Sequence, residues 1–195
     1  MGGSKSYNRA EEDVGNIIGL EHVNLLVPDQ SLATLFYISG LGLTRDPYLM
    51  TSTDLMWVNI GREQFHLPTR GTQRLRGHIG LVINDFDRLA QRLEGVREGL
   101  RGTKFGFKRD RGCIEVTCPW GNRFRCYRPG KRFGQMQHGI TYVCFDVSTG
   151  AAGAIALFYN EIIGAPARMG QFDKATAAYV CAGGGLLYRE GPAGG

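Results

Sequence analysis

Residues 20–27 read LEHVNLLV, residues 76–83 read RGHIGLVI and residues 136–145 read MQHGITYVCF. Each stretch has a histidine (His22, His78 or His138) near the start of a run of Val, Ile, Leu and aromatic residues, which is typical of a buried β-strand. The histidines are 56 and 60 residues apart. A repeat of this period indicates supersecondary units that bury their cores by packing against one another.

The segments that follow these strands repeat as well. Residues 31–47 and 151–170 both contain Leu-Phe-Tyr and then a glycine six residues after the phenylalanine, which predicts an amphipathic helix ended by glycine. Residues 84–95 (NDFDRLAQRLEG) predict a third helix, with Asp85 and Asp87 at its start as capping residues. Strand signals then follow each helix, at 55–60 and 63–68, at 113–119 and 122–129, and at 176–184 and 185–190.

The predicted order is therefore strand, helix, then two or three strands, three times over. We expect an α+β protein with units at 18–69, 75–129 and 136–190. The polar residues 1–17 are expected to form a disordered tail, and the Gly-rich residues 191–195 a second tail.

Composition restricts the class of protein. Of the 195 residues, 43% are hydrophobic and 21% are charged, which is ordinary for a globular protein. No apolar run approaches the roughly 18 residues that a membrane-spanning helix needs, and the N-terminus has no signal-peptide core. The five cysteines form no CxxC pair, which indicates reduced thiols. These features predict a cytoplasmic protein with no membrane partner.

The positive charge is concentrated in one segment. The chain has a net charge of +5, and residues 101–132 contain ten Lys and Arg against two acidic residues. Such a segment is either a solvated basic loop or a surface that recruits an anionic ligand. The sequence has no nucleic-acid-binding motif, so nucleic acid is not expected as a partner.

At four places the sequence resembles the vicinal oxygen chelate superfamily of glyoxalase I, extradiol dioxygenases and bleomycin-resistance-type binding proteins. These places are EHVNLLVPD (21–29), FYISGLGL (36–43), GHIGLVINDFDRLAQRL (77–93) and CPWGNRFRCYRP (118–129). The resemblance implies βαβββ modules that pair to enclose a U-shaped cleft of mixed or antiparallel sheet, with helices outside. Modules 18–69 and 75–129 would form the first domain, within 18–130.

The third module, 136–190, has no partner in the resemblance. It is unpaired or truncated, so either the natural chain continues into a fourth module or the third module pairs with another subunit. The second alternative predicts a homo-oligomer, in the simplest case a dimer.

The resemblance also implies a metal site. Carried over by motif, its ligand positions are His22, His66, His78 and Arg125. The three imidazoles suit a divalent transition metal, with Fe(II) favoured and Mn or Zn as alternatives. Arginine stands where the family usually has a ligating glutamate, and a guanidinium has no lone pair to donate. The alternative is therefore a cleft without any metal.

Strand alternation predicts the other residues of the cleft. Side chains two residues apart share a face, so Asn24, Gln64 and Tyr127 would line the cleft together with the histidines. Arg125 would bind an anionic oxygen of the substrate. Trp57 would stack on a planar substrate.

Two functions follow from these residues. The first is a metal-dependent enzyme that acts on a small substrate with vicinal oxygens. For this enzyme we favour an extradiol-dioxygenase-like oxidoreductase over a lyase, because glyoxalase-type proton transfer needs a carboxylate base. The second is a metal-free protein of the bleomycin-resistance type that binds or sequesters an anionic or aromatic compound. The sequence does not identify a catalytic residue.

Overall fold

The computed structural model describes residues 19–49, 53–180 and 185–191. They form two compact units, Leu20–Val143 and the described residues from Cys144 onward. The expected tails, 1–17 and nearly all of 191–195, lie outside the described residues. None of the helices in the described part of the chain is both long and apolar enough to cross a membrane.

The first module is a four-stranded sheet with one helical segment. Its elements are β1 (His22–Asn24), α2 (Gln30–Ala33), the π-helix η1 (Thr34–Gly40), β2 (Thr44–Arg45), β3 (Leu55–Ile60) and β4 (Glu63–Pro68). The strand order is β1-β4-β3-β2, with β1 parallel to β4 and β3 antiparallel to both of its neighbours. Gly61 and Arg62 form the tight turn between β3 and β4.

The second module repeats this arrangement. Its elements are β5 (Gly77–Val82), α3 (Phe86–Gly95), β6 (Gly106–Asp110), β7 (Cys113–Thr117) and β8 (Arg123–Tyr127). The strand order is β5-β8-β7-β6, again with the first strand parallel to the last and the others antiparallel. A short 3₁₀ helix, η2 (Lys131–Phe133), follows.

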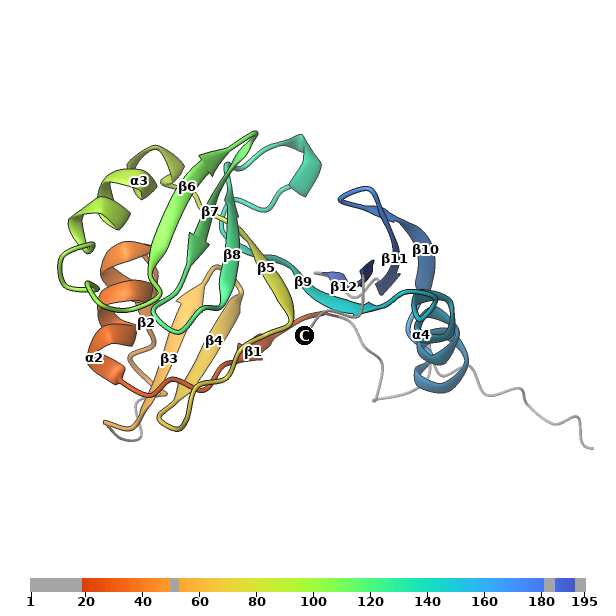
Figure 1. Ribbon diagram of the computed structural model, residues 1–195, viewed down its shortest axis with the longest axis horizontal. Helices are drawn as coiled ribbons and strands as arrows, with labels where there is room; N and C mark the ends of the chain where they lie inside the picture. Colours follow the sequence, from red (N-terminus) through yellow and green to blue (C-terminus); the bar gives the residue numbers. More distant parts are fainter. Residues whose placement is uncertain (1–18, 50–52, 181–184, 192–195) are drawn as a thin grey trace, which may run out of the picture. The chain divides into compact units, whose positions relative to one another are not determined.

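One aromatic core joins the first two modules. Phe36 and Tyr37 of η1, Phe65 of β4 and Phe124 of β8 are all fully or almost fully buried. The ring centroids of Phe36 and Phe124 are 5.7 Å apart, and those of Phe65 and Phe124 are 6.0 Å apart. Figure 1 shows α2 and α3 on the same side of the strands of this unit. The two sheets therefore turn their apolar faces to the helices, which is the packing that the sequence predicted.

The second unit has the same order of elements. These are β9 (Gly139–Ser148), which begins in the first unit, α4 (Ala152–Phe158), the π-helix η3 (Tyr159–Ile163), β10 (Ala167–Phe172), β11 (Ala175–Val180) and β12 (Gly185–Gly191). β11 is antiparallel to β10 and β12, and β12 lies beside β9. Its buried cluster consists of small residues, Ala152, Ala156 and Ala178.

The predicted glycine ends of the helices within residues 31–47 and 151–170 are confirmed. Gly42 and Gly164 have φ angles of +76° and +74°, a left-handed conformation that glycine adopts without a steric penalty. The same backbone hydrogen bond closes both turns: Leu43 donates to Tyr37 at 3.1 Å, and Ala165 donates to Tyr159 at 2.9 Å.

Asp85 is the N-cap residue of α3 and Asp87 lies in its first turn, as the sequence predicted, but the side-chain hydrogen bond expected from the N-cap residue is absent. The Asp85 carboxylate makes no capping hydrogen bond and accepts one from Arg92 at 2.8 Å. The Asp87 carboxylate is paired with Arg128 at 2.7 Å. Both carboxylates are thus paired with arginine side chains, and in these pairs donor and acceptor are both charged.

The basic segment is not one long loop, because it contains β6, β7 and β8. The sequence signals also missed β2, β6 and β10. Each of the three lies at an edge of its sheet and pairs on one side only. Edge strands of this kind carry charged and exposed residues, so the alternation that marks an inner strand is weak in them.

Candidate functional site

The polar face of the first sheet carries an aromatic platform made of His22, Trp57 and His66. Trp57 and His66 are direct partners across β3 and β4, and their rings are stacked with centroids 4.2 Å apart. The His22 ring meets Trp57 edge-on at 5.2 Å and His66 edge-on at 6.3 Å. Strand alternation explains this grouping, because Val58 and Phe65, the sequence neighbours of Trp57 and His66, point into the core.

The platform histidines differ in their electrostatic surroundings. Burial lowers the pKa of His66, and the nearby His22 lowers it further. His66 is therefore neutral at pH 7, with a lone pair on one ring nitrogen. His22 Nδ1 lies 2.8 Å from the carboxylate of Glu21.

The two predicted polar residues beside the platform have different surroundings. The Gln64 amide donates to Asn59 at 2.6 Å and to Asp46 at 3.0 Å. The amide nitrogen of Gln64 is thus already hydrogen-bonded to other side chains of the protein. Asn24 is exposed and is the register partner of His66 on β1. Of the two, Asn24 is the one presented to solvent.

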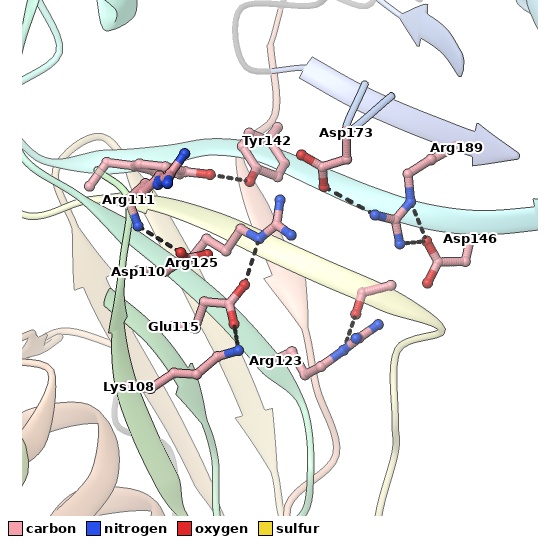
Figure 2. Close-up of polar contacts among 12 residues, drawn as sticks. Lys108, Asp110, Arg111, Glu115, Arg123, Arg125, Tyr142, Asp146, Asp173 and Arg189 are labelled. Atoms are coloured by element: carbon pink, nitrogen blue, oxygen red, sulfur yellow. Dashed lines mark hydrogen bonds and ion pairs between the residues drawn. The ribbon is translucent and has the colours of Figure 1, made fainter. Parts of the chain in front are cut away.

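The polar face of the second sheet carries an ionic ladder, Lys108–Glu115–Arg125, one residue from each of β6, β7 and β8. The three residues are neighbours in the strand register. Figure 2 shows the Glu115 carboxylate between the two cations, 3.3 Å from Arg125 Nε and 2.9 Å from Lys108 Nζ. The hydrogen bond from Lys108 and the charge of Arg125 lower the pKa of Glu115. Arg125 lies on the predicted face, but a carboxylate of the same face already neutralises part of its charge.

A tyrosine from the third histidine strand covers His78. Tyr142 of β9 packs edge-on against the His78 ring at 5.5 Å and leaves only 3% of His78 exposed. Its hydroxyl lies 2.8 Å from the hydroxyl of Tyr127. Gly80 makes room for this ring, because a Cβ there would lie 2.3 Å from it. His78 and Tyr127 are therefore less accessible than alternation alone predicted.

The structure brings together two of the three predicted metal ligands, His22 and His66. In the described part of the chain, no group of three or more His, Cys, Asp or Glu side chains is arranged to hold a metal ion. His78 packs on Tyr142, and Arg125 offers no lone pair. These residues, as they stand, do not fit a metal centre, and the three-histidine site stays a prediction.

Sequence reasoning missed two residues of these faces, Glu115 and Tyr142. Glu115 could have been found from the alternation of opposite charges across the β6–β7 hairpin. Tyr142 carries no such signal, because its contact with His78 depends on β9 lying beside β5.

A separate pocket of about 300 Å³ lies near the start of α3 and the β6–β7 hairpin. Phe86, Arg109 and Cys113 are among its lining residues. It contains none of the residues that the sequence predicted for a site.

No known family model matches this chain, and no match is found among curated proteins. Solved structures do resemble it. A "putative dioxygenase" from Bacillus subtilis superimposes with a TM-score of 0.57 and 15% identity, over 92% of this chain and 66% of that one. Glyoxalase I from Zea mays superimposes with a TM-score of 0.59 and 16% identity, over 90% of this chain and 68% of that one.

The chain thus spans about two thirds of the length of these two structures. At such low identity the similarity shows the fold alone. That fold is the arrangement of βαβββ modules of the vicinal oxygen chelate superfamily, which the sequence resemblance implied.

Proposed function

We propose that residues 20–143, which have the vicinal oxygen chelate fold, bind a small aromatic or anionic compound without a resident metal ion. The observation that carries this proposal is the aromatic platform. His22, Trp57 and His66 lie on a polar sheet face, opposite the buried core. A stacked indole and neutral imidazole offer a flat surface on which planar compounds stack favourably.

The ionic ladder supports an anionic group on the ligand. Arg125 presents a planar guanidinium that matches a carboxylate or phosphate in geometry. Glu115 competes for the same cation at 3.3 Å. A ligand anion would therefore bind by sharing or displacing that contact, so its affinity depends on the charge at position 115.

Two features support binding without a metal. Arginine occupies the position where the resemblance expects a ligating glutamate, and the ring of Tyr142 packs against His78. An ion bound by His22 and His66 would gain His78 as its third protein ligand only after the contact between His78 and Tyr142 is rearranged.

A thermal-shift screen with a panel of aromatic carboxylic acids, with and without chelator, tests the proposal. We expect stabilisation that survives the chelator and is lost in Trp57→Ala. Tyr48→Ala is the matched control, because Tyr48 is an exposed aromatic residue of the same unit that lies outside the platform. Stabilisation that the chelator abolishes, or that Trp57→Ala leaves intact, would overturn the proposal.

Two charge variants separate the role of Arg125 from that of the platform. Glu115→Gln removes the carboxylate that competes with the ligand for Arg125 and should tighten the binding of aromatic acids, whereas Arg125→Glu should weaken it. One charged hydrogen bond corresponds to a change in Kd of about tenfold or more. Neutral amides of the same acids should bind both variants as they bind the parent. Equal changes for acids and amides would show that Arg125 does not contact the anion.

The second candidate function is a metal-dependent enzyme of the extradiol-dioxygenase-like type. The nearness of His22 and His66 favours it, since two imidazoles are already gathered. Fe(II) would be the favoured ion, with Mn or Zn as alternatives. Metal analysis and Fe(II) titration of the purified protein test this candidate. Less than about 0.1 equivalent of any transition metal, with no uptake of added Fe(II), would reject it.

The remaining expectations from the sequence concern the reaction type, the oligomeric state and the location of the protein. A lyase of the glyoxalase type is less favoured, because the platform provides no carboxylate base beyond Glu21. A homo-oligomer and a cytoplasmic location remain predictions from sequence.

A further inference from the structure

The pocket of about 300 Å³ beside the β6–β7 hairpin, which we call the hairpin pocket, lies on the opposite face of the second sheet from the ionic ladder. In the strand register Arg109 of β6 pairs with Ile114 of β7, and Ile114 pairs with Cys126 of β8. These positions alternate with those of the ionic ladder, so their side chains lie on the other face. Arg109 and Ile114 line the hairpin pocket. It is therefore separate from the ligand site proposed above.

One arginine of the hairpin pocket is held in a fixed orientation. The Arg128 guanidinium lies 5.1 Å from the centroid of the Phe86 ring, and Phe86 also lines the pocket. It donates two hydrogen bonds to the Asp87 carboxylate, at 2.7 and 2.5 Å. A guanidinium has five N–H groups, so Arg128 retains donors for a second anion beside Asp87.

Arg109 supplies a second, exposed cation. The hydrogen bond from Arg128 lowers the pKa of Asp87, and the charges of Arg128 and Arg109 lower it further. Arg109 therefore acts on the same region as the Arg128–Asp87 pair. The two cations face this single carboxylate, which leaves an excess of positive charge at the pocket.

The other acidic residue of the lining, Asp110, does not cancel this excess. Asp110 and Lys108 are two residues apart on β6, so both side chains turn to the face of the ionic ladder. There the Asp110 carboxylate accepts a hydrogen bond from the backbone N–H of Arg111 at 2.7 Å, as Figure 2 shows. Its charge also raises the pKa of Lys108, after the larger effect of Glu115.

The remaining surface of the hairpin pocket is apolar. Phe86 of α3 and Ile114 of β7 line it, and Gly112 in the hairpin turn has no atom within 4 Å of its Cβ position. A volume of this size is at the lower end of the range for small-molecule sites, roughly 300–1,000 Å³. The lining therefore suits a small ligand with an apolar body and an anionic group.

The two guanidinium groups favour phosphate as the anionic group. Each guanidinium is planar and matches phosphate oxygens with paired N–H donors. A phosphate monoester carries a charge of about −1.5 to −2 at pH 7, so it can accept from two guanidinium groups at once. A carboxylate carries only one charge and would leave one of the two cations uncompensated.

We propose that the hairpin pocket binds the phosphate monoester of a small aromatic compound. The phosphate lies between Arg109 and Arg128, and the ring packs against Phe86 and Ile114. This inference goes beyond the proposed function, because it concerns the other face of the sheet and other residues. It also gives a role to part of the basic segment, residues 101–132, as a surface that recruits an anion.

Calorimetric titration of the full 195-residue protein with phenyl phosphate tests the proposal. We expect Arg109→Met to raise the Kd by about tenfold or more, because a charged hydrogen bond is lost. Arg111→Met is the matched control, since Arg111 is an exposed arginine of the same hairpin that does not line the pocket. It should leave the Kd unchanged. Asp87→Asn removes the carboxylate that shares Arg128 and should lower the Kd. Circular dichroism checks that the variants are folded.

Phenyl phosphate is also an aromatic anion, so the titration is repeated in Trp57→Ala, which removes the indole of the aromatic platform. Binding at the hairpin pocket should persist in Trp57→Ala. Inorganic phosphate should bind more weakly than phenyl phosphate, because it lacks the ring. The proposal would be overturned by an absence of binding, by equal effects of Arg109→Met and Arg111→Met, or by binding that Trp57→Ala abolishes. Failure of the platform to bind aromatic carboxylic acids would leave these expectations intact.

Discussion

The two units of this chain have the same order of elements but bury very different side chains. The first unit has a core of large aromatic residues, with Phe36, Tyr37, Phe65 and Phe124 in mutual contact. The second unit buries mostly alanines, together with Val180 and Leu187, and its helix has a covered side and an open side. The difference shows that a βαβββ sequence pattern defines the module, whereas the pairing of two modules buries the large aromatic side chains of the first unit.

Two polar contacts join elements of the second unit. Arg189 of β12 donates to Asp146 of β9 at 2.9 Å through Nε and to Asp173 at 3.1 Å. The hydroxyls of Tyr159 and Tyr188 are 2.6 Å apart and join the helix to the sheet. We therefore expect the first unit to be sensitive to changes in packing and the second to changes in charge.

Truncation of the shared core should have the largest effect. Phe124→Ala removes a ring that touches both modules and should lower the free energy of unfolding of the first unit by about 3–5 kcal/mol. Phe158→Ala should change that of the second unit by less than about 1 kcal/mol in the monomer. Both tryptophans, Trp57 and Trp120, lie in the first unit, so their fluorescence follows it alone, and hydrogen exchange follows both units. Equal losses in the two units would contradict the comparison.

Substitution of a glycine in the β3–β4 turn, which packs against the residue before β9, should have the next largest effect. Gly61 has a φ of +68°, and a Cβ there would lie 2.1 Å from the His138 carbonyl oxygen. Gly61→Ala should therefore cost at least about 2 kcal/mol, because the backbone must move. Gly112, with a φ of +80° and no atom near its Cβ position, is the control. Gly112→Ala should cost about 1 kcal/mol from conformation alone. If urea denaturation gives equal costs, the contact with His138 does not contribute.

The ion pairs of the second unit should have a smaller effect. Arg189→Met removes a half-buried cation from two aspartates and should destabilise that unit by about 1–2 kcal/mol. Arg168→Met is the control, since Arg168 is exposed and stacks over Tyr179 at 4.5 Å, a contact of about 0.5–1 kcal/mol. Hydrogen exchange of residues 144–180 gives the measurement. Tryptophan fluorescence should not change in either variant, and a change would mean that the ion pairs act on the first unit.

Sequence patterns predicted the parts of the fold that depend on local chemistry. The inner strands β4 and β8 were found from alternation, and the glycine helix ends from spacing. The edge strands β2, β6 and β10 were missed because they pair on one side only. The aspartates were placed correctly at the start of α3, but their pairing with Arg92 and Arg128 was not predicted, because the fold brings these arginines near.

In the candidate site, too, the sequence predicted local features but not contacts that the fold creates. Alternation predicted that Gln64 and His66 share a face opposite Phe65, and their burial agrees. It did not predict that Glu115 would neutralise part of the charge of Arg125, because that contact depends on strand register. Nor did it predict that Tyr142 would cover His78, because that contact joins two strands about 60 residues apart in the sequence.

The smallest expected effect is a dependence on pH that only the first unit shows. All four histidines lie in that unit, and burial lowers the pKa of both His66 and His138. An unfolded histidine has a pKa of about 6.5, so the unfolded chain takes up protons that the folded unit resists as the pH falls below that value. The first unit should therefore be less stable at pH 5.5 than at pH 7.5, until the pH falls below the folded pKa values.

His66→Gln should reduce this dependence, and the double variant with His138→Gln should reduce it further. Glu63, whose pKa is raised by burial, acts in the opposite direction but titrates mainly at lower pH. Urea denaturation followed by tryptophan fluorescence at pH 5.5, 6.5 and 7.5 provides the measurement for the first unit. Hydrogen exchange, corrected for its intrinsic pH dependence, follows the second unit. An equal loss of stability in the second unit, which contains no histidine, would place the titrating group elsewhere and break the contrast between the two units.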